Sequence, residues 1–109
     1  MPVKYVQFVG FNSNTTDKLL DTDLDLPIYE QHLSLLRARL ANDGDYTYLV
    51  LNDGTQTEAV RVANHGGFLK LLRGLEDTTA TSFPAGTCVR WEITPSAVRD
   101  IICQMECCP

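Results

Sequence analysis

The chain has 109 residues, of which 44% are hydrophobic and 21% are charged, and its formal net charge at pH 7 is −5. This composition excludes a disordered chain, and the longest apolar runs are far shorter than the ~20 residues that cross a bilayer. The acidic balance and the lack of a Lys/Arg cluster argue against nucleic-acid binding, so we expect a protein partner.

The N-terminal part is expected to hold one strand and an acidic loop. Apolar alternation over residues 3–9 predicts a first strand that is covered on both faces. Residues 11–25 are rich in Asn, Ser, Thr and Asp, which predicts a loop. Carboxylates at alternate positions in residues 21–25 resemble the start of a calcium loop, but Pro27 stands near the place of the glycine turn. A solvated acidic loop is therefore favoured.

A helix is expected at residues 27–41. Pro27 suits the first helical position, and apolar or aromatic residues then recur with fourfold spacing at Ile28, His32, Leu36 and Leu40. His32 lies on this stripe. A packing role is favoured for it over a catalytic or metal-binding role, because no second ligand is placed nearby.

Three strands are expected after this helix, because the apolar period changes to two. They span residues 46–51, 57–63 and 68–72. The sequences Asn-Asp-Gly-Thr at 52–55 and Asn-His-Gly-Gly at 64–67 are typical of turns between antiparallel neighbours. The pattern predicts an antiparallel meander.

The second hairpin predicts a charged pair. If residues 64–67 form a four-residue loop, the residue numbers of each facing pair add up to 131. Glu58 then faces Arg73. A carboxylate on an apolar face is costly to bury alone, and arginine satisfies it with forked hydrogen bonds. We interpret the pair as structural, fixing the place where the loop at 74–82 leaves the sheet. A catalytic carboxylate with an arginine clamp is disfavoured, because no nucleophile or general base converges on it.

The loop at 74–82 is rich in hydroxyl groups, which order a connection through bonds to the backbone. Residues 87–93 then alternate as a strand, with Val89, Trp91 and Ile93 expected to point inward. Trp91 is interpreted as a core residue.

A last helix is expected from Thr94, as the N-cap, followed by Pro95. Its helical spacing gives one apolar face, made of Val98, Ile101, Ile102 and Met105. That face must pack either on the sheet or on a neighbouring subunit.

Four cysteines lie in the last quarter of the chain, at Cys88, Cys103, Cys107 and Cys108. Their thiolates are weak candidates for zinc or an iron–sulfur cluster, because the usual Cys-x-x-Cys spacing is missing. Free or packed thiols are favoured, with disulfides, including disulfides between subunits, as the second interpretation. No cofactor is expected.

Two motifs carry a resemblance. Arg73-Gly74-x-x-x-Thr78-Thr79-Ala80, followed by Pro84-Ala85-Gly86-Thr87 and an alternating strand, resembles small β-rich modules of bacteriophage tail proteins. These include the attachment ends of tail fibres and baseplate components. The likeness extends upstream through the Asp53-Gly54 turn and Glu58-x-Val60-x-Val62, so it covers roughly the middle and last thirds.

The resemblance implies a non-enzymatic virion structural protein of the tail tip or baseplate, assembled in the host cytoplasm. It would be an attachment or adaptor subunit, present as a homo-oligomer such as a trimer or hexamer, that joins tail components or carries fibres. Capsid decoration or a head–tail connector is the alternative, and a small metal- or thiol-dependent protein is the second alternative. No catalytic motif is present, so the chain is not expected to be an enzyme.

The expected fold class is α+β and mainly β, as an antiparallel meander or a small, partly open barrel with two short helices. We expect one virion-structural domain, with an N-terminal strand and acidic loop at 1–26, a helix plus meander at 27–94, and a C-terminal helix with the cysteine-rich end at 95–109. The interface candidates are exposed or terminal features next to apolar anchors: Thr78, Thr79, Phe83, Ile101 and Met105.

Overall fold

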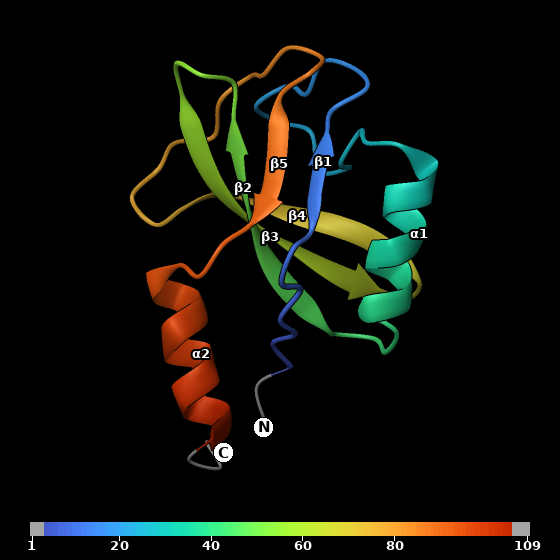
Figure 1. Cartoon of the computed structure of the whole chain (residues 1–109), viewed down its shortest axis with the longest axis vertical. Coiled ribbons are helices and arrows are strands. Elements are labelled where there is room, and N and C mark those ends of the chain that lie inside the picture. The colour runs from blue at the N-terminus through green and yellow to red at the C-terminus, as the bar shows by residue number, and fades with distance from the viewer. Residues whose placement is uncertain (1–3, 106–109) are drawn as a thin grey trace.

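Five strands form one open antiparallel sheet with a helix on each face (Figure 1). The computed structural model describes residues 4–105. In chain order its elements are β1 (Asn12–Asn14), α1 (Glu30–Arg39), β2 (Tyr46–Asn52), β3 (Thr57–His65), β4 (Phe68–Leu75), β5 (Cys88–Trp91) and α2 (Pro95–Met105). The strand order is β1-β5-β2-β3-β4. The expected α+β, mainly β class with an antiparallel meander and two short helices is confirmed, and the sheet is open. No helix in this described part is long and apolar enough to span a membrane.

The main core lies between the sheet and the layer formed by α1 and the loop that precedes it. Alternate residues of β2 and β3 point to this side, so Leu49 and Val60 pack with Leu36 of α1. The other members are aliphatic apart from two phenylalanines: Phe11, Leu19, Leu26, Ile28, Leu40, Leu51, Val62, Leu71, Phe83 and Val89. This is the larger of the two packed layers.

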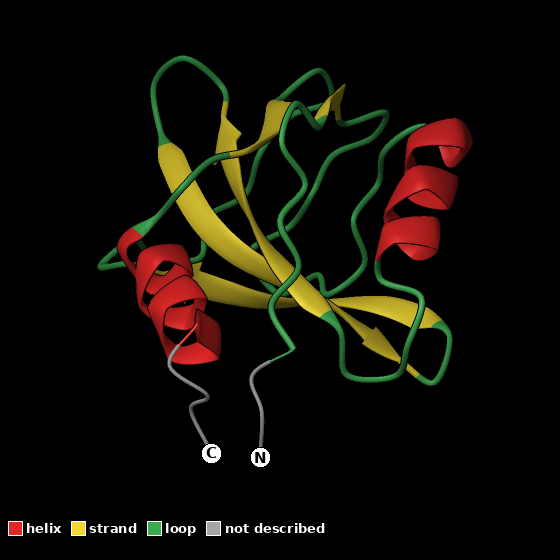
Figure 2. Cartoon of the chain, turned by 60° about the horizontal axis from the view of Figure 1, so that its bottom comes forward, coloured by secondary structure: helices red, strands yellow, loops and turns green. Residues whose placement is uncertain are grey.

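α2 packs on the opposite face of the sheet (Figure 2), and a smaller aromatic core lies beneath it. Tyr5, Tyr48 and Ala97 are its buried members, and Tyr46 and Ile101 pack against it. The rings of Tyr5, Tyr46 and Tyr48 lie 5.6–5.9 Å apart, which is a range in which tilted aromatic pairs attract.

The predicted first strand is wrong. Residues 4–9 contribute only one bridge, between Tyr5 and Tyr46, and the first strand is β1, inside the expected loop. β1 is a three-residue edge strand that pairs with β5, so its backbone supplies the hydrogen bonds. Alternation buries Ser13 and leaves Asn12 and Asn14 in solvent. A polar sequence is therefore compatible with an edge strand.

The first helix begins later than predicted. Ile28 is extended and bridges Thr15, and Tyr29 has a ψ of 140°, so α1 starts at Glu30 rather than Pro27. It ends at Arg39. Glu30 lies in the first turn and Arg39 in the last, which complements the helix dipole.

The register of the second hairpin also differs from the prediction. The turn is Gly66-Gly67, whose φ angles of 59° and 94° suit a two-residue turn, so His65 pairs with Phe68. The residue numbers of each facing pair near the turn add up to 133 instead of the predicted 131. The shift is two residues, so each side chain keeps its face of the sheet. Farther along, the register changes again between Ala59 and Arg61.

Candidate interaction surface

Arg73 is the centre of a buried ionic network. Its Nε donates to Oε2 of Glu58 at 2.7 Å, and its Nη2 donates to Oε1 at 3.0 Å. The other bonds go to backbone carbonyls, at 2.7 Å to Leu20, 2.8 Å to Asp23 and 2.7 Å to Thr81. All five N–H groups of the guanidinium therefore have an acceptor.

The carboxylate oxygens of Glu58 also have a full set of hydrogen-bond donors. Besides the two bonds from Arg73, it accepts the backbone N–H of Gly74 at 2.9 Å and that of Thr81 at 2.9 Å. The Glu58 side chain is 0% exposed and that of Arg73 is 6% exposed. The two side chains form the predicted pair, but diagonally, because the register shift brings Gly74 and Arg73 together opposite Val60.

The network lowers the pKa of Glu58. Burial by itself raises this pKa, but the hydrogen bonds from Arg73 and from the backbone N–H groups of Thr81 and Gly74 outweigh burial. The carboxylate thus stays ionised inside the core. With every lone pair occupied, it has no capacity left to accept a proton from a substrate, so the structural interpretation fits its surroundings.

The hydroxyl-rich loop folds back onto the sheet. Thr81 joins the ionic network, and Oγ1 of Thr78 accepts the backbone N–H of Ala59 at 3.1 Å. Phe83 is only 1% exposed and pairs with Leu19 through backbone bonds. Phe83 is therefore an internal contact and is wrong as an interface candidate, whereas Thr78 is half-buried and Thr79 is exposed.

The acidic loop is bound to the sheet by its own residues. Asp25 pairs with Lys70 at 2.7 Å, Asp23 accepts the N–H of Leu20 at 2.8 Å, and the Leu24 carbonyl accepts the N–H of Leu71. These carboxylates do not converge. Among residues 4–105, no three His, Cys, Asp or Glu side chains are arranged to hold a metal ion.

Cys88 and Cys103, the two cysteines in the described part of the chain, differ in state. Cys88 is a free, half-buried thiol at the start of β5, the end of that strand far from α2 (Figure 1). Cys103, on α2, is disulfide-bonded, so for this residue the favoured free thiol is wrong and the second interpretation, a disulfide, applies. The predictions for Cys107 and Cys108 lie outside the described residues.

Sequence reasoning missed two polar contacts. Oγ of Ser13 lies 2.6 Å from Nδ1 of His32, whose ring also packs edge-on against Phe11 and Tyr29. Ser13 is only 3% exposed, so its hydroxyl is not open to a substrate. His32 therefore has the packing role that was favoured.

The second missed contact anchors α2. Asp100 is buried and accepts the phenol of Tyr46 at 2.6 Å and that of Tyr48 at 2.7 Å, while Nε of Arg99 donates to its other oxygen at 3.0 Å. Burial by itself raises the pKa of Asp100, but these hydrogen bonds outweigh burial and lower it. Burial and the same carboxylate raise the pKa of Tyr48 to about 12.

Because of these bonds, the side of α2 that packs on the sheet differs from the apolar side predicted from its sequence. Thr94 caps the helix as predicted, with Oγ1 accepting the N–H of Ala97 at 3.1 Å. Ala97 and Asp100 are buried against the sheet, and the interface candidate Ile101 is half-buried and packs against the same aromatic core. The side chain of Met105 lies outside the described set.

Three apolar residues are consequently left in solvent. Val98 is 43% exposed and Ile102 is 50% exposed, one helical turn apart on α2. Ile93, predicted to point inward, is 61% exposed just before the helix. We call these three residues the α2 stripe. Neighbouring exposed apolar residues on one helix are a candidate contact for another protein.

The signal for this arrangement was present in the sequence. Ala97, Asp100, Ile101 and Gln104 have the same helical spacing as the apolar positions, and they form an equally continuous face. Two tyrosines at period two on β2 supply the phenols that the aspartate needs. The apolar face drew attention first, because hydrophobic residues usually define the buried side.

The chain matches no protein-family model and no curated protein.

Proposed function

We propose that this protein is a non-enzymatic structural subunit of a bacteriophage virion, acting as an attachment or adaptor subunit of the tail tip or baseplate. The observation that carries the proposal is the orientation of α2. This helix buries Asp100 and leaves Val98 and Ile102 in solvent. The tail-protein resemblance of the Arg73–Thr87 region supplies the virion context.

The hydrogen bonds made by the buried charged groups favour a binding role over catalysis. Glu58 and Asp100 are buried carboxylates, and hydrogen bonds hold both of them in the ionised form. A general base needs an accessible lone pair within reach of its substrate. These carboxylates are instead positioned to fasten a loop and a helix to the sheet.

The α2 stripe supports a partner contact. The helix is held in place by polar bonds, so the orientation of its apolar side is fixed before any partner arrives. Gln104 adds to this by accepting the N–H of Tyr5 at 2.8 Å, and Glu76 accepts the N–H of Ser96 at 3.1 Å. A preorganised apolar surface loses less entropy on binding than a mobile one.

The test begins with particles purified from a strain that carries and expresses the gene. Peptides of this chain should be found in the particles by mass spectrometry, and gold-labelled antibody should mark the tail end in electron micrographs. Label on the head would replace the tail assignment with capsid decoration or head–tail joining. Complete absence of the chain from intact particles would reject the virion proposal.

A further inference from the structure

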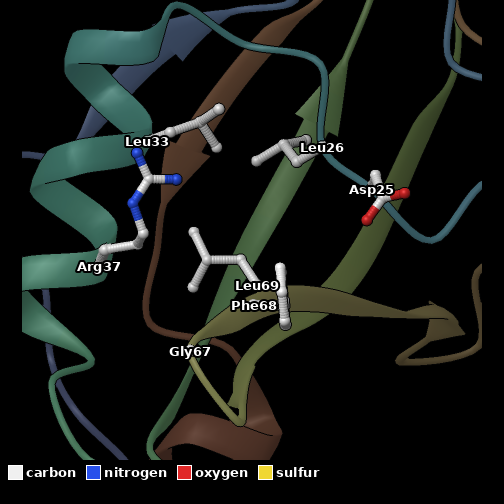
Figure 3. Close-up of a pocket in the computed structure, with 7 residues that line it drawn as sticks. All are labelled: Asp25, Leu26, Leu33, Arg37, Gly67, Phe68 and Leu69. Atoms are coloured by element: carbon white, nitrogen blue, oxygen red, sulfur yellow. The ribbon is translucent and has the colours of Figure 1, made fainter.

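A small pocket lies on the α1 side of the molecule, between α1, the acidic loop and the Gly66-Gly67 turn (Figure 3). Its volume is about 180 Å³. Leu26, Leu33 and Leu69 form its aliphatic walls, and they belong to the main core or pack against it. Two charged residues at its rim are in ion pairs with other residues of the chain. All of these contacts lie within one chain, and none of them points to a ligand.

A strained turn lies on the other side of the sheet, at residues 75–78. The N–H of Thr78 donates to the carbonyl of Leu75 at 2.9 Å, and the central residues Glu76 and Asp77 have φ angles of 59° and 61°. In the described part of the chain, these two are the only residues other than glycine with a positive φ. Turns with a positive φ at both central positions usually contain glycine, asparagine or aspartate. Glu76 is therefore held in a conformation that is unfavourable for its residue type.

The side chain of Glu76 reaches the N-terminal end of α2. Its Oε1 accepts the N–H of Ser96, in the first turn of the helix, at 3.1 Å. The first N–H groups of a helix have no partner inside the helix. Thr94 satisfies one of them, that of Ala97, and Glu76 satisfies another from 20 residues away in the chain. The negative charge of Glu76 also suits the positive end of the helix dipole.

α2 depends on such contacts from outside the helix. It has 11 residues, and an isolated helix of this length is only marginally stable in water. Asp100 holds its middle to the phenols of two tyrosines, and Gln104 accepts the N–H of Tyr5 near its end. Glu76 is the contact at its beginning, so withdrawal of Glu76 leaves the first turn of α2 without this support.

The turn itself is fixed to the sheet on both sides. Oγ1 of Thr78 accepts the N–H of Ala59, in β3, at 3.1 Å. The buried carboxylate of Glu58 accepts the N–H of Gly74 before the turn and that of Thr81 after it. A strained conformation persists only where the surrounding bonds determine it in this way.

We propose that the turn at residues 75–78 is a strap that couples the position of α2 to the hydroxyl-rich loop. Glu76 is its positioning residue, because the bond to α2 offsets the strain of the left-handed conformation. The loop and the helix then open and close as one unit, and coupling between them acts equally in both directions. The inference concerns the fold and does not depend on a virion role. It names what positions the beginning of the helix that carries the α2 stripe.

The test compares two glycine substitutions in the turn. Glu76→Gly and Asp77→Gly each relieve the strain of one positive φ, but only Glu76→Gly removes the bond to Ser96. Asp77 is exposed, so Asp77→Gly is the matched control. Glu76→Gln keeps an acceptor oxygen at the end of a side chain of the same length and is the rescue variant. Backbone hydrogen exchange is measured residue by residue on the full chain, and urea denaturation checks the fold.

Glu76→Gly should speed up exchange in residues 96–104 by about tenfold, because a hydrogen bond to a charged acceptor is lost. Asp77→Gly should leave these residues as protected as in the wild type, and Glu76→Gln should lie closer to the wild type than Glu76→Gly does. A turn that is strained without acting on α2 would become more stable in both glycine variants. Unchanged protection of α2 in a folded Glu76→Gly variant would therefore overturn the proposal.

Asp100→Asn measures the same coupling from the other end. This change weakens the bonds between α2 and the two tyrosines and touches no residue of the turn. Because the coupling is reciprocal, the N–H of Thr78 should exchange faster together with the helix. Faster exchange in α2 with a wild-type rate at Thr78 would show that the two segments open separately, which contradicts the strap even where Glu76→Gly fails to fold.

Discussion

Glu58 and Arg73 are two residues from neighbouring strands that satisfy each other in the core, with Nε of Arg73 2.7 Å from Oε2 of Glu58. The same guanidinium binds carbonyls of the acidic loop and of the hydroxyl-rich loop. Three chain segments are therefore joined through one side chain. The fold depends on this connection more than on the exposed ion pairs.

Replacing Arg73 with alanine should lower stability strongly. The change leaves Glu58 as an uncompensated buried charge, and such losses cost about 3–5 kcal/mol in the free energy of unfolding. Urea denaturation at neutral pH measures the difference. The comparison variant is Arg37→Ala, which breaks an exposed pair with Glu30 and should cost less than ~1 kcal/mol. Equal, small losses in the two variants would contradict the role given to Arg73.

Stability should fall on acidification. The pKa values of Glu58 and Asp100 are lowered in the folded state. At pH values between the ordinary carboxyl range and these lower pKa values, the unfolded chain therefore binds more protons than the folded protein does. Their contribution is present above a pH of about 4 and is lost as the pH falls through the folded-state values. Melting temperatures measured from neutral to acid pH test this. Glu58→Gln should be less stable at neutral pH, with a shallower acid decline.

Stability should also fall at high pH because of the two phenols beneath α2. Tyr48 has its pKa raised to about 12, and burial raises that of Tyr46 as well. A raised pKa means that the neutral phenol is favoured in the folded protein, so this contribution holds below a pH of about 10 and is lost above it. Burial also raises the pKa of Tyr5, so absorbance titration near 295 nm should show three tyrosines ionising late. Titration of all tyrosines at the ordinary pH would refute the buried arrangement.

Asp100→Asn should loosen α2 specifically. The neutral amide cannot accept both phenols as strongly as the carboxylate does, and hydrogen bonds to charged groups contribute about 1.5–3 kcal/mol each. Hydrogen exchange should therefore speed up in residues 95–104 and remain slow in β2 and β3. Uniform acceleration across the sheet would mean that Asp100 supports the whole fold instead of the helix.

The sequence predicted the class of fold because period-two patterns and glycine turns define the β2, β3 and β4 segments locally. It misplaced the first strand, since β1 is held by backbone pairing with β5 and its polar side chains carry no apolar period. The register error came from counting the turn as four residues when two positive-φ glycines complete it. Local residue types set the turn, but the length of the paired strands depends on the whole sheet.

The candidate site was only partly predictable. The Glu58–Arg73 pair followed from charge on an apolar face, and it survived the register error because a two-residue shift preserves faces. The orientation of α2 could not follow from its own sequence, since it depends on Tyr46 and Tyr48 about 50 residues earlier. The candidate Ile101 is therefore half-buried against the sheet, whereas its neighbour Ile102 is exposed.

The central claim is that the outward face of α2 binds a neighbouring virion protein. Its most direct measurement is the amount of protein incorporated into particles when a gene-deleted phage is complemented with Val98→Asp or with the Leu35→Asp control. Both substitutions replace exposed apolar residues and should change the free energy of unfolding by no more than about 0.5 kcal/mol. We expect the Val98 variant to be missing from particles and the Leu35 variant to be incorporated normally. Normal incorporation of a folded Val98 variant would contradict the claim.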